Sequence, residues 1–175
     1  MNVTISRDKL AWLVQTASRP IPARTTIPAI RGCLIEATSD RLVFYGTNLD
    51  WGVRVSSEAQ VSSSGSLVVS SKILEDVVRT ISSSEVTLSL DESAWALTVR
   101  SGAGEMVLNA IPADDFPKWP EAPDAEKVVL KGDLFREMVK IGATCAVTNP
   151  ARPLWGACLL EFKDGKLVMV STDQF

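Results

Sequence analysis

The sequence predicts an α+β fold in which one short module, a strand followed by a helix and two more strands, is repeated along the chain. Three observations predict it. Three segments carry apolar residues at the spacing i, i+3, i+4, i+7, which marks one face of a helix. A short β-prone run precedes each of them. Constant shifts in position relate the three segments to one another.

The three predicted helices share one apolar pattern. Their apolar positions are Leu10, Leu13, Val14 and Ala17 in the first, Leu74, Val77, Val78 and Ile81 in the second, and Phe135, Met138, Val139 and Gly142 in the third. A shift of 64 positions relates the first helix to the second, and a shift of 125 relates the first to the third. We therefore expect each helix to bury one face against a sheet.

A predicted strand and a predicted N-cap precede each helix. The strands are Val3-Thr4-Ile5-Ser6, Leu67-Val68-Val69-Ser70 and Val128-Val129-Leu130-Lys131. Ser6, Ser70 or Ser71, and Asp133 are suitable N-cap residues, because their side-chain oxygens can accept a hydrogen bond from a free amide of the first turn.

The shift of 125 continues into two predicted strand pairs. Cys33-Leu34-Ile35-Glu36 falls on Cys158-Leu159-Leu160-Glu161, and Arg41-Leu42-Val43 falls on Lys166-Leu167-Val168. Each copy is predicted to be two strands joined by a polar turn, at 37–41 and at 163–166. A further strand, 51–57, follows the first copy.

The repeat predicts the domain organisation. Residues 1–125 are expected to form one complete domain of two halves, 1–62 and 63–125, and residues 126–175 the first, incomplete half of a second domain. Residues 111–126 are rich in Pro, Asp and Trp and are predicted to be a linker. A helix on two strands leaves an unpaired edge and a half-covered apolar face. We therefore expect either a fragment of a longer chain or a domain-swapped or edge-paired dimer.

Composition excludes several kinds of site. The chain has no histidine, which removes the commonest general base and the commonest metal ligand. Its three cysteines are scattered, which favours reduced, buried thiols over disulfides or a zinc site. The first residues are charged where a signal peptide would be apolar, so we expect a cytoplasmic protein. The net charge of -3 allows a basic face but not a basic molecule. No cofactor or metal is expected.

Four further motifs stand out: Arg24-Thr25-Thr26-Ile27-Pro28-Ala29-Ile30, Gly46-Thr47-Asn48-Leu49-Asp50, Ile111-Pro112-Ala113-Asp114-Asp115-Phe116-Pro117 and Ser171-Thr172-Asp173-Gln174-Phe175. These motifs resemble segments of the bacterial DNA polymerase III beta subunit family, the beta sliding clamps. The resemblance implies the DNA clamp fold, in which each domain is two βαβββ halves with two helices packed on antiparallel sheets. It also implies a ring of two chains, joined head to tail around duplex DNA.

The resemblance implies a processivity factor that does no chemistry and tethers DNA polymerase III to duplex DNA. Its implied partners are the polymerase alpha subunit, the clamp loader and other proteins with clamp-binding motifs. The positions that match DNA-facing positions of the family are Arg24, Lys72, Arg79, Asn149 and Arg152. Each of these charges could instead be a solvated surface charge, and Asn149 precedes Pro150, so a turn role is an alternative.

Two further surfaces follow from the resemblance. Trp155, Thr172 and Phe175 match a cleft that accepts short linear peptides, although Trp155 could instead pack in a core. Glu105, Met106 and Leu108 match the edge that meets a partner subunit. Glu105 stands where the family often has a basic residue, which would reverse the local attraction, while Met106 or Leu108 could supply an apolar contact.

Two rival functions remain open at the level of sequence. The chain could be a clamp-like module, or a truncated fragment, that binds a partner without encircling DNA. It could also be an enzyme in which Asp114-Asp115 and Glu36 act as paired carboxylates or magnesium ligands. The adjacent Asp pair in a Pro-rich segment is better explained by turn formation.

Overall fold

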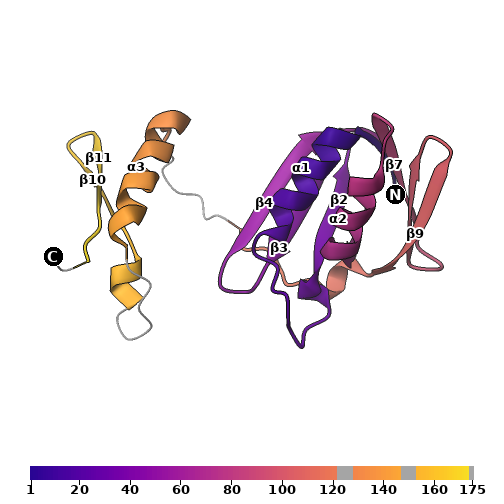
Figure 1. Cartoon of the computed structure of the whole chain (residues 1–175), viewed down its shortest axis with the longest axis horizontal. Helices are drawn as coiled ribbons and strands as arrows, with labels where there is room; N and C mark the ends of the chain where they lie inside the picture. The colour runs from indigo at the N-terminus through magenta and orange to yellow at the C-terminus, as the bar shows by residue number, and fades with distance from the viewer. Residues whose placement is uncertain (122–127, 147–152, 174–175) are drawn as a thin grey trace. The chain divides into compact units, whose positions relative to one another are not determined.

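The computed structural model describes residues 1–121, 128–146 and 153–173 (Figure 1). The chain forms two compact units, Met1–Pro120 and Glu121–Phe175. The first unit contains, in chain order, β1 Asn2–Ser6, α1 Arg7–Ser18, η1 Ala29–Arg31, β2 Gly32–Thr38, β3 Arg41–Thr47, β4 Gly52–Glu58, β5 Gln60–Ser63, β6 Gly65–Ser70, α2 Ser71–Thr80, β7 Glu85–Asp91, β8 Ala96–Ser101, β9 Gly104–Ile111 and η2 Ala113–Asp115. The second contains α3 Gly132–Cys145, η3 Pro153–Gly156, β10 Leu159–Lys163 and β11 Lys166–Val170.

The strands of the first unit show the predicted repeat. They form one antiparallel nine-stranded sheet in the order β4-β3-β2-β6-β9-β8-β7-β1-β5. Each half adds its first strand to the other half's strands: β6 pairs with β2, with Cys33 opposite Val69, and β1 pairs with β7, with Val3 opposite Leu88. The order β4-β3-β2-β6 is thus matched by β9-β8-β7-β1. This exchange confirms the α+β fold of repeated βαβββ halves.

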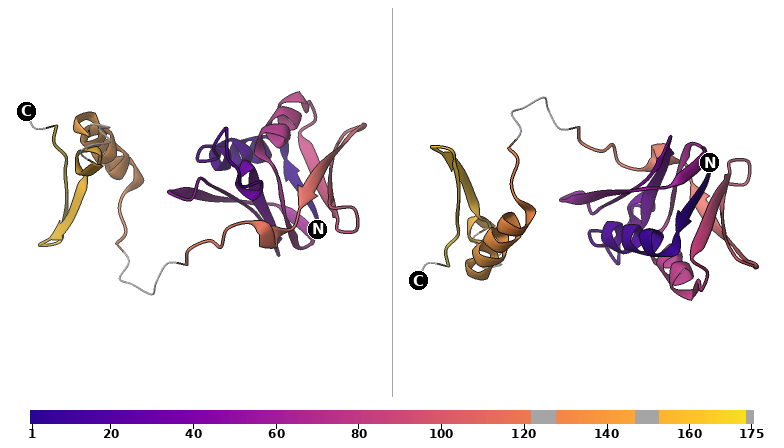
Figure 2. Two further views of the ribbon diagram at one scale, coloured as in Figure 1. Left: turned by 90° about the horizontal axis from the view of Figure 1, so that it is seen from below. Right: turned by 90° about the horizontal axis from the view of Figure 1, so that it is seen from above.

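Both helices of the first unit lie side by side on the same face of the sheet (Figures 1 and 2). The four predicted apolar positions of α1 are fully buried, and those of α2 are buried as well. Ser6 and Ser70 are the N-caps: their hydroxyl oxygens accept from the amides of Lys9 at 3.4 Å and Ile73 at 3.5 Å. Local pattern therefore determines where these two helices begin and which face each of them buries.

A second, smaller cluster covers the opposite face of the sheet. It joins Leu34, Val43, Tyr45, Val68 and Phe116. The ring of Trp119 meets that of Tyr45 edge-on at 5.1 Å between centroids. The prediction of a linker over 111–126 is therefore wrong for its first part, because β9 extends to Ile111 and the following residues pack on the sheet as far as Trp119.

In its described residues, the second unit consists of the helix α3, the short helix η3 and the antiparallel pair β10–β11. Asp164 and Gly165, with φ of 52° and 71°, form the tight turn of the β10–β11 hairpin. Many large apolar side chains of this unit are exposed, among them Val129 at 94%. Of the four residues on the predicted apolar face of α3, only Gly142 is fully buried.

Two predictions for this unit are wrong. Residues 128–131 form no strand, because a strand needs a partner, and the strands that flank β1 in the first unit come much later in the chain. Asp133 does not cap α3. The helix begins at Gly132 after Lys131, which makes no side-chain cap, and Asp133 instead pairs with Arg136 at 2.9 Å.

One close contact recurs in both units at the shift of 125. In the first unit the backbone of Gly46 lies so close to the end of α1 that a Cβ there would stand 1.9 Å from the carbonyl oxygen of Ala17. In the second unit Ser171 occupies the position of Gly46, and its hydroxyl donates to the carbonyl oxygen of Gly142 at 2.6 Å. The repeat therefore extends to how each helix end meets its sheet.

Candidate functional site

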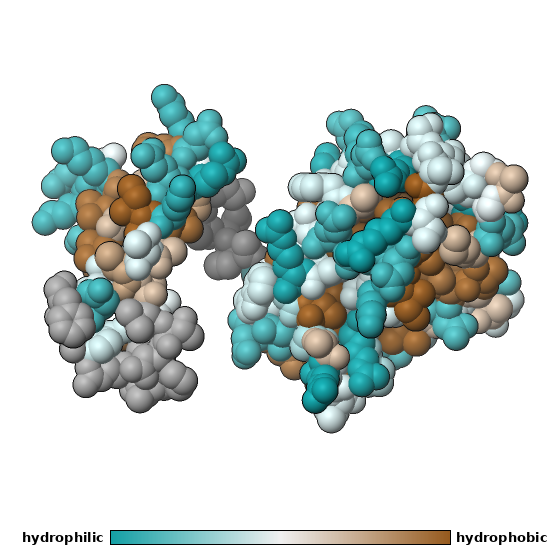
Figure 3. All heavy atoms as spheres, viewed as in Figure 1, coloured by the Kyte–Doolittle hydropathy of each residue, from teal (hydrophilic) through white to brown (hydrophobic). Residues whose placement is uncertain are grey.

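The outward side of the helix pair in the first unit is mostly polar, although α1 also exposes Trp12 and α2 exposes Ile73. Figure 3, viewed from the side that bears α1 and α2, shows hydrophilic residues across much of this face. Exposed residues on it include Lys9 and Gln15 from α1 and Lys72, Asp76 and Arg79 from α2. The core lies beneath the helices, so this side is free to meet another molecule.

The two helices run antiparallel. A small hollow at one end lies between Arg7 of α1 and Arg79 of α2. A wider hollow of about 360 Å³ at the other end lies between Ser18 of α1 and Ser71 of α2. The two ends of the face differ in how their cations are paired.

Cations at the wide end are free. Arg19 follows α1, Arg24 is exposed in the following loop, Arg31 ends η1, and Lys72 lies in the first turn of α2. Within the described parts of the chain, none of these four has an ion pair. Arg31 and Lys72 both line the wide hollow. The family resemblance implies Arg24 and Lys72 as DNA-facing residues but does not single out Arg19 or Arg31.

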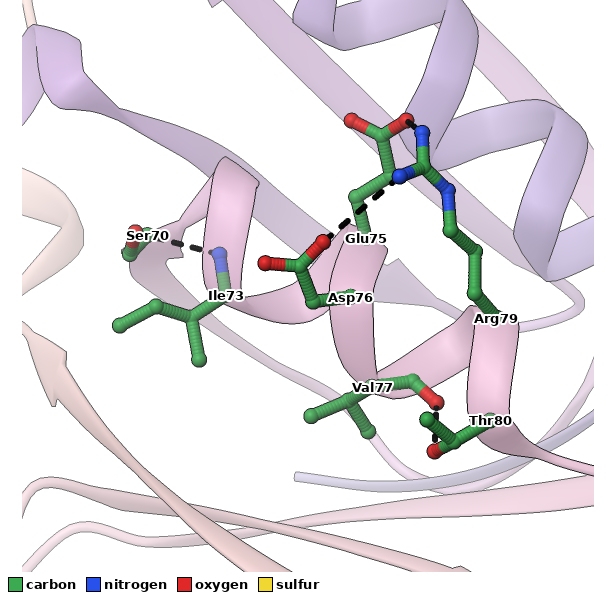
Figure 4. A network of polar contacts seen from close by, with 7 residues as sticks. All are labelled: Ser70, Ile73, Glu75, Asp76, Val77, Arg79 and Thr80. Carbon is green, nitrogen blue, oxygen red and sulfur yellow. Dashed lines mark hydrogen bonds and ion pairs between the residues drawn. The ribbon is translucent and has the colours of Figure 1, made fainter.

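Arg79, by contrast, is held by its own helix. Figure 4 shows its guanidinium turned back along α2 towards two carboxylates. It pairs with Glu75 one turn earlier and with Asp76 at 3.7 Å. The positive charge of Arg79, which was predicted to face DNA, is therefore balanced by carboxylates of its own helix. The i,i+4 and i,i+3 spacing of these residues is visible in the sequence.

Three groups with displaced pKa values lie in the sheet or its turns. Burial raises the pKa of the Cys33 thiol to about 12. Burial, together with a hydrogen bond from the Tyr45 hydroxyl to Glu36 at 2.7 Å, raises the pKa of Tyr45. Hydrogen bonds from Ser93 and Ala94 lower the pKa of Asp91 in the β7–β8 turn. All three shifts have local structural causes.

The predicted carboxylate site does not assemble. Asp114 and Asp115 lie exposed in η2, while Glu36 accepts the hydrogen bond from Tyr45. Within residues 1–121, 128–146 and 153–173, no three His, Cys, Asp or Glu side chains gather as metal ligands would. Across the same residues, no helix has the length and apolar character needed to cross a membrane.

The predicted partner edge is β9. Its residues 104–109 pair with β8, and β6 joins it only at Ala110 and Ile111. Among the residues that the structure describes, the edge of β9 away from β8 is therefore unpaired over most of its length. Met106 is exposed at 40%, whereas Leu108 is buried in the core and is not available for contact. Glu105 pairs with Arg100 on β8, so its charge is balanced within the hairpin.

A hollow of about 270 Å³ lies beside this edge. The end of α2 contributes Val77 and Ile81, and the β8–β9 hairpin contributes Val99 and Met106. Nothing in the sequence pattern marks it, because its walls come from segments that meet only in the fold.

The predicted peptide-cleft residues belong to the second unit. Trp155 is half-buried in η3, and Thr172 is exposed just after β11. Phe175 lies outside the described residues, as do the predicted DNA-facing residues Asn149 and Arg152. The neighbouring Leu154 is 85% exposed, so η3 presents an apolar surface to solvent.

Comparison with known proteins gives a family match and several similar proteins. The family described as "DNA polymerase III beta subunit, N-terminal domain" matches residues 1–120. The chain is similar to the beta sliding clamp of Streptomyces coelicolor, with 29% identity over all of this chain and 46% of that protein. It is also similar to the beta sliding clamp of Bacillus subtilis, with 24% identity over 99% of this chain and 48% of that protein. The chain thus spans about half the length of these curated relatives.

Solved structures agree in fold. The DNA polymerase sliding clamp from Bacillus subtilis superposes with a TM-score of 0.91 at 23% identity, covering 99% of this chain and 47% of that one. A sliding clamp from Pseudomonas aeruginosa bound to griselimycin gives a TM-score of 0.90 at 23% identity, with the same coverage.

Proposed function

Because the chain belongs to the DNA polymerase III beta subunit family, we propose that it acts as a DNA sliding clamp subunit, a processivity factor that tethers DNA polymerase III to duplex DNA by encircling it. The family match over residues 1–120 carries the proposal. The helix pair supports it, because it offers cations that have no ion pair among the described residues, on one face of a molecule whose net charge is -3.

Tethering works by effective concentration. A polymerase that releases its template remains beside it and rebinds before it can diffuse away. Sliding requires contacts that are nearly equal at every step, and phosphate contacts from Lys and Arg meet that need because they read no sequence. A face with a few flexible cations on a rigid helix pair suits this task.

The proposed DNA contacts start with Arg24 and Lys72, which are exposed at the wide end of the helix pair. Asn149 and Arg152 are proposed as contacts from their match to the family alone. Arg79 is also proposed at the DNA-facing surface, where its pairing with Glu75 and Asp76 limits it to a weaker role.

The proposed protein partners are the polymerase alpha subunit, the clamp loader and other proteins that carry clamp-binding motifs. Trp155, Thr172 and Phe175 are proposed to form part of a cleft for their peptides. An exposed Leu154 beside a half-buried Trp155 supports an apolar docking surface here.

A head-to-tail contact with a second subunit is proposed at β9. Its free edge can accept another strand, and the 270 Å³ hollow beside Met106 can receive an apolar side chain. The balanced Glu105–Arg100 pair makes this contact apolar and backbone-driven rather than electrostatic. The subunit performs no catalysis of its own in this proposal, and it acts in the cytoplasm.

Retention on circular DNA tests the proposal. The chain is incubated with a nicked circular plasmid and passed through a sizing column, alone and after the plasmid is linearised, while light scattering gives its mass. A ring that encircles DNA co-elutes with circles and is lost from linear DNA. Equal retention on both forms, or none on either, contradicts encirclement.

A second candidate is a clamp-like module that binds a partner and never encircles DNA. The exposed apolar surface of the second unit favours it, since side chains such as Val129 and Phe162 are 94% and 57% exposed. This candidate predicts no retention on circles together with binding of a clamp-binding peptide.

A further inference from the structure

We propose that the wide hollow between the end of α1 and the start of α2 seats a DNA backbone phosphate through Arg31 and Lys72, and that Arg79 supports this seat by neutralising Glu75. The inference rests on the proposed function only in that the helix face meets duplex DNA. It adds a binding residue, Arg31, and gives Arg79 a positioning role in place of a direct contact.

The hollow has the chemistry of a phosphate seat. Arg31 and Lys72 both line its volume of about 360 Å³, and neither has an ion pair among the described residues. The Ser71 hydroxyl donates to the backbone carbonyl of Arg31 at 3.4 Å, which ties η1 to the start of α2. The two cations are therefore fixed on neighbouring backbone segments although they lie 41 positions apart in the sequence.

Two more features favour an anion in this hollow. The hydroxyl of Ser18, which also lines it, is buried and has no hydrogen-bond partner in the described structure. Arg19 and Arg24 are exposed and directly follow Ser18 and Ala23, two residues that line the hollow. The guanidinium of Arg31 and the ammonium of Lys72 are the charged donors from which a phosphate in the hollow can accept.

Glu75 is the one carboxylate in the lining, and Arg79 controls it. An unpaired Glu75 would repel a phosphate in the hollow. Its side chain is 25% exposed, and its carboxylate accepts from the guanidinium of Arg79 (Figure 4). Asp76 also pairs with Arg79, at 3.7 Å, but it does not line the hollow. Arg79 therefore acts on the seat through Glu75.

Salt dependence of DNA binding tests the phosphate contacts. Binding of a labelled duplex of mixed sequence is measured by fluorescence anisotropy across a salt series. Each lost phosphate contact lowers the slope of log K against log salt by about 0.9, so between 50 and 200 mM salt the wild-type affinity should fall about 3.5-fold further than that of Arg31→Gln or Lys72→Gln. The matched control is Lys118→Gln, which removes an exposed cation from the segment that packs on the opposite face of the sheet and should leave the slope unchanged.

Rescue of an Arg79 variant tests the positioning role. Arg79→Gln should weaken binding without changing the salt slope. The double variant Glu75→Gln/Arg79→Gln should recover wild-type affinity within about twofold, and Asp76→Asn/Arg79→Gln, which has the same net charge, should recover less. Circular dichroism of each variant confirms that the fold is kept.

The outcomes separate the two proposals. A wild-type chain that fails to bind duplex DNA at low salt contradicts the proposed function, and this inference falls with it. Binding with an unchanged slope in Arg31→Gln contradicts the phosphate seat alone. A reduced slope in Arg79→Gln that Glu75→Gln does not rescue means that Arg79 itself contacts DNA, which overturns its positioning role.

Discussion

Replacing Gly46 by alanine should strongly destabilise the first unit. A Cβ at this position would lie 1.9 Å from the carbonyl oxygen of Ala17 and 2.9 Å from its carbonyl carbon. Real Cβ contacts essentially never fall below 3.0 Å, so β3 and the end of α1 would have to separate by about 1.1 Å, the difference between 3.0 and 1.9 Å. The clash is between the new Cβ of residue 46 and the backbone of Ala17, so no side-chain rotation can relieve it.

The separation has a cost that can be bounded. Leu13, Val14 and Ala17 of α1 are fully buried, and moving the helix end loosens their packing. Overpacking of a tight core typically costs 1–3 kcal/mol, and the lower entropy of the unfolded alanine chain returns about 0.4–1 kcal/mol. A Cβ only 1.9 Å from a backbone oxygen corresponds to the upper end of that overpacking range, so we expect a net loss of about 2–2.6 kcal/mol in the free energy of unfolding.

Urea unfolding followed by tryptophan fluorescence measures this loss, since four of the five tryptophans (12, 51, 95 and 119) lie in the first unit. Gly104→Ala is the matched control, because its Cβ would meet nothing closer than 3.4 Å and its stability should change by no more than about 0.5 kcal/mol. If Gly46→Ala and Gly104→Ala unfold at the same urea concentration, the close approach of α1 and β3 is refuted.

Three further outcomes follow from the same structure. Asn48→Ala should cost about 1–2 kcal/mol in urea unfolding, because the Asn48 side-chain oxygen accepts from two backbone amides at 3.0 and 2.9 Å; an unchanged midpoint would rule out this turn. The free energy of unfolding should fall by about 1.4 kcal/mol per pH unit between pH 9 and 12, because the Cys33 thiol loses its proton near its ordinary pKa of 9.0 in the unfolded chain but keeps it to about 12 in the folded protein. Below pH 9 this contribution of Cys33 to stability is fully present. Cys33→Ala should flatten the plot of unfolding free energy against pH in this range. In the native chain a thiol reagent should modify the exposed Cys145 and spare Cys33 until the protein unfolds, and equal rates for both would contradict the burial of Cys33.

The helices of the first unit could be predicted in detail because their information is local. The spacing of Leu10, Leu13, Val14 and Ala17 marks the buried face of α1, and Ser6 marks its start. A strand forms only beside a partner strand, so the local sequence predicts strands less well than helices. Residues 3–6 become β1 because β5 and β7 flank them, whereas the similar run 128–131 has no such neighbours in the described part of the chain and forms no strand.

The candidate site could be predicted only in part. Family resemblance pointed to Arg24 and Lys72, which lie exposed at one end of the helix pair. It could not reveal Arg31, which joins Lys72 only because η1 and the start of α2 meet in the fold. The pairing of Arg79 with Glu75 could be predicted from their spacing along one helix. Assigning roles from the family one position at a time does not take such neighbours into account.

Hydrogen–deuterium exchange of the whole chain, with and without duplex DNA at low salt, tests the central claim that the helix pair of the first unit is the DNA-facing surface. We expect DNA to protect amides at the end of α1, in the following loop through Arg31, and in the first turn of α2. Amides of the segment that contains Phe116 and Trp119, which packs on the opposite face of the sheet, should be unaffected. Protection confined to that segment, with none along the helix pair, would contradict the account.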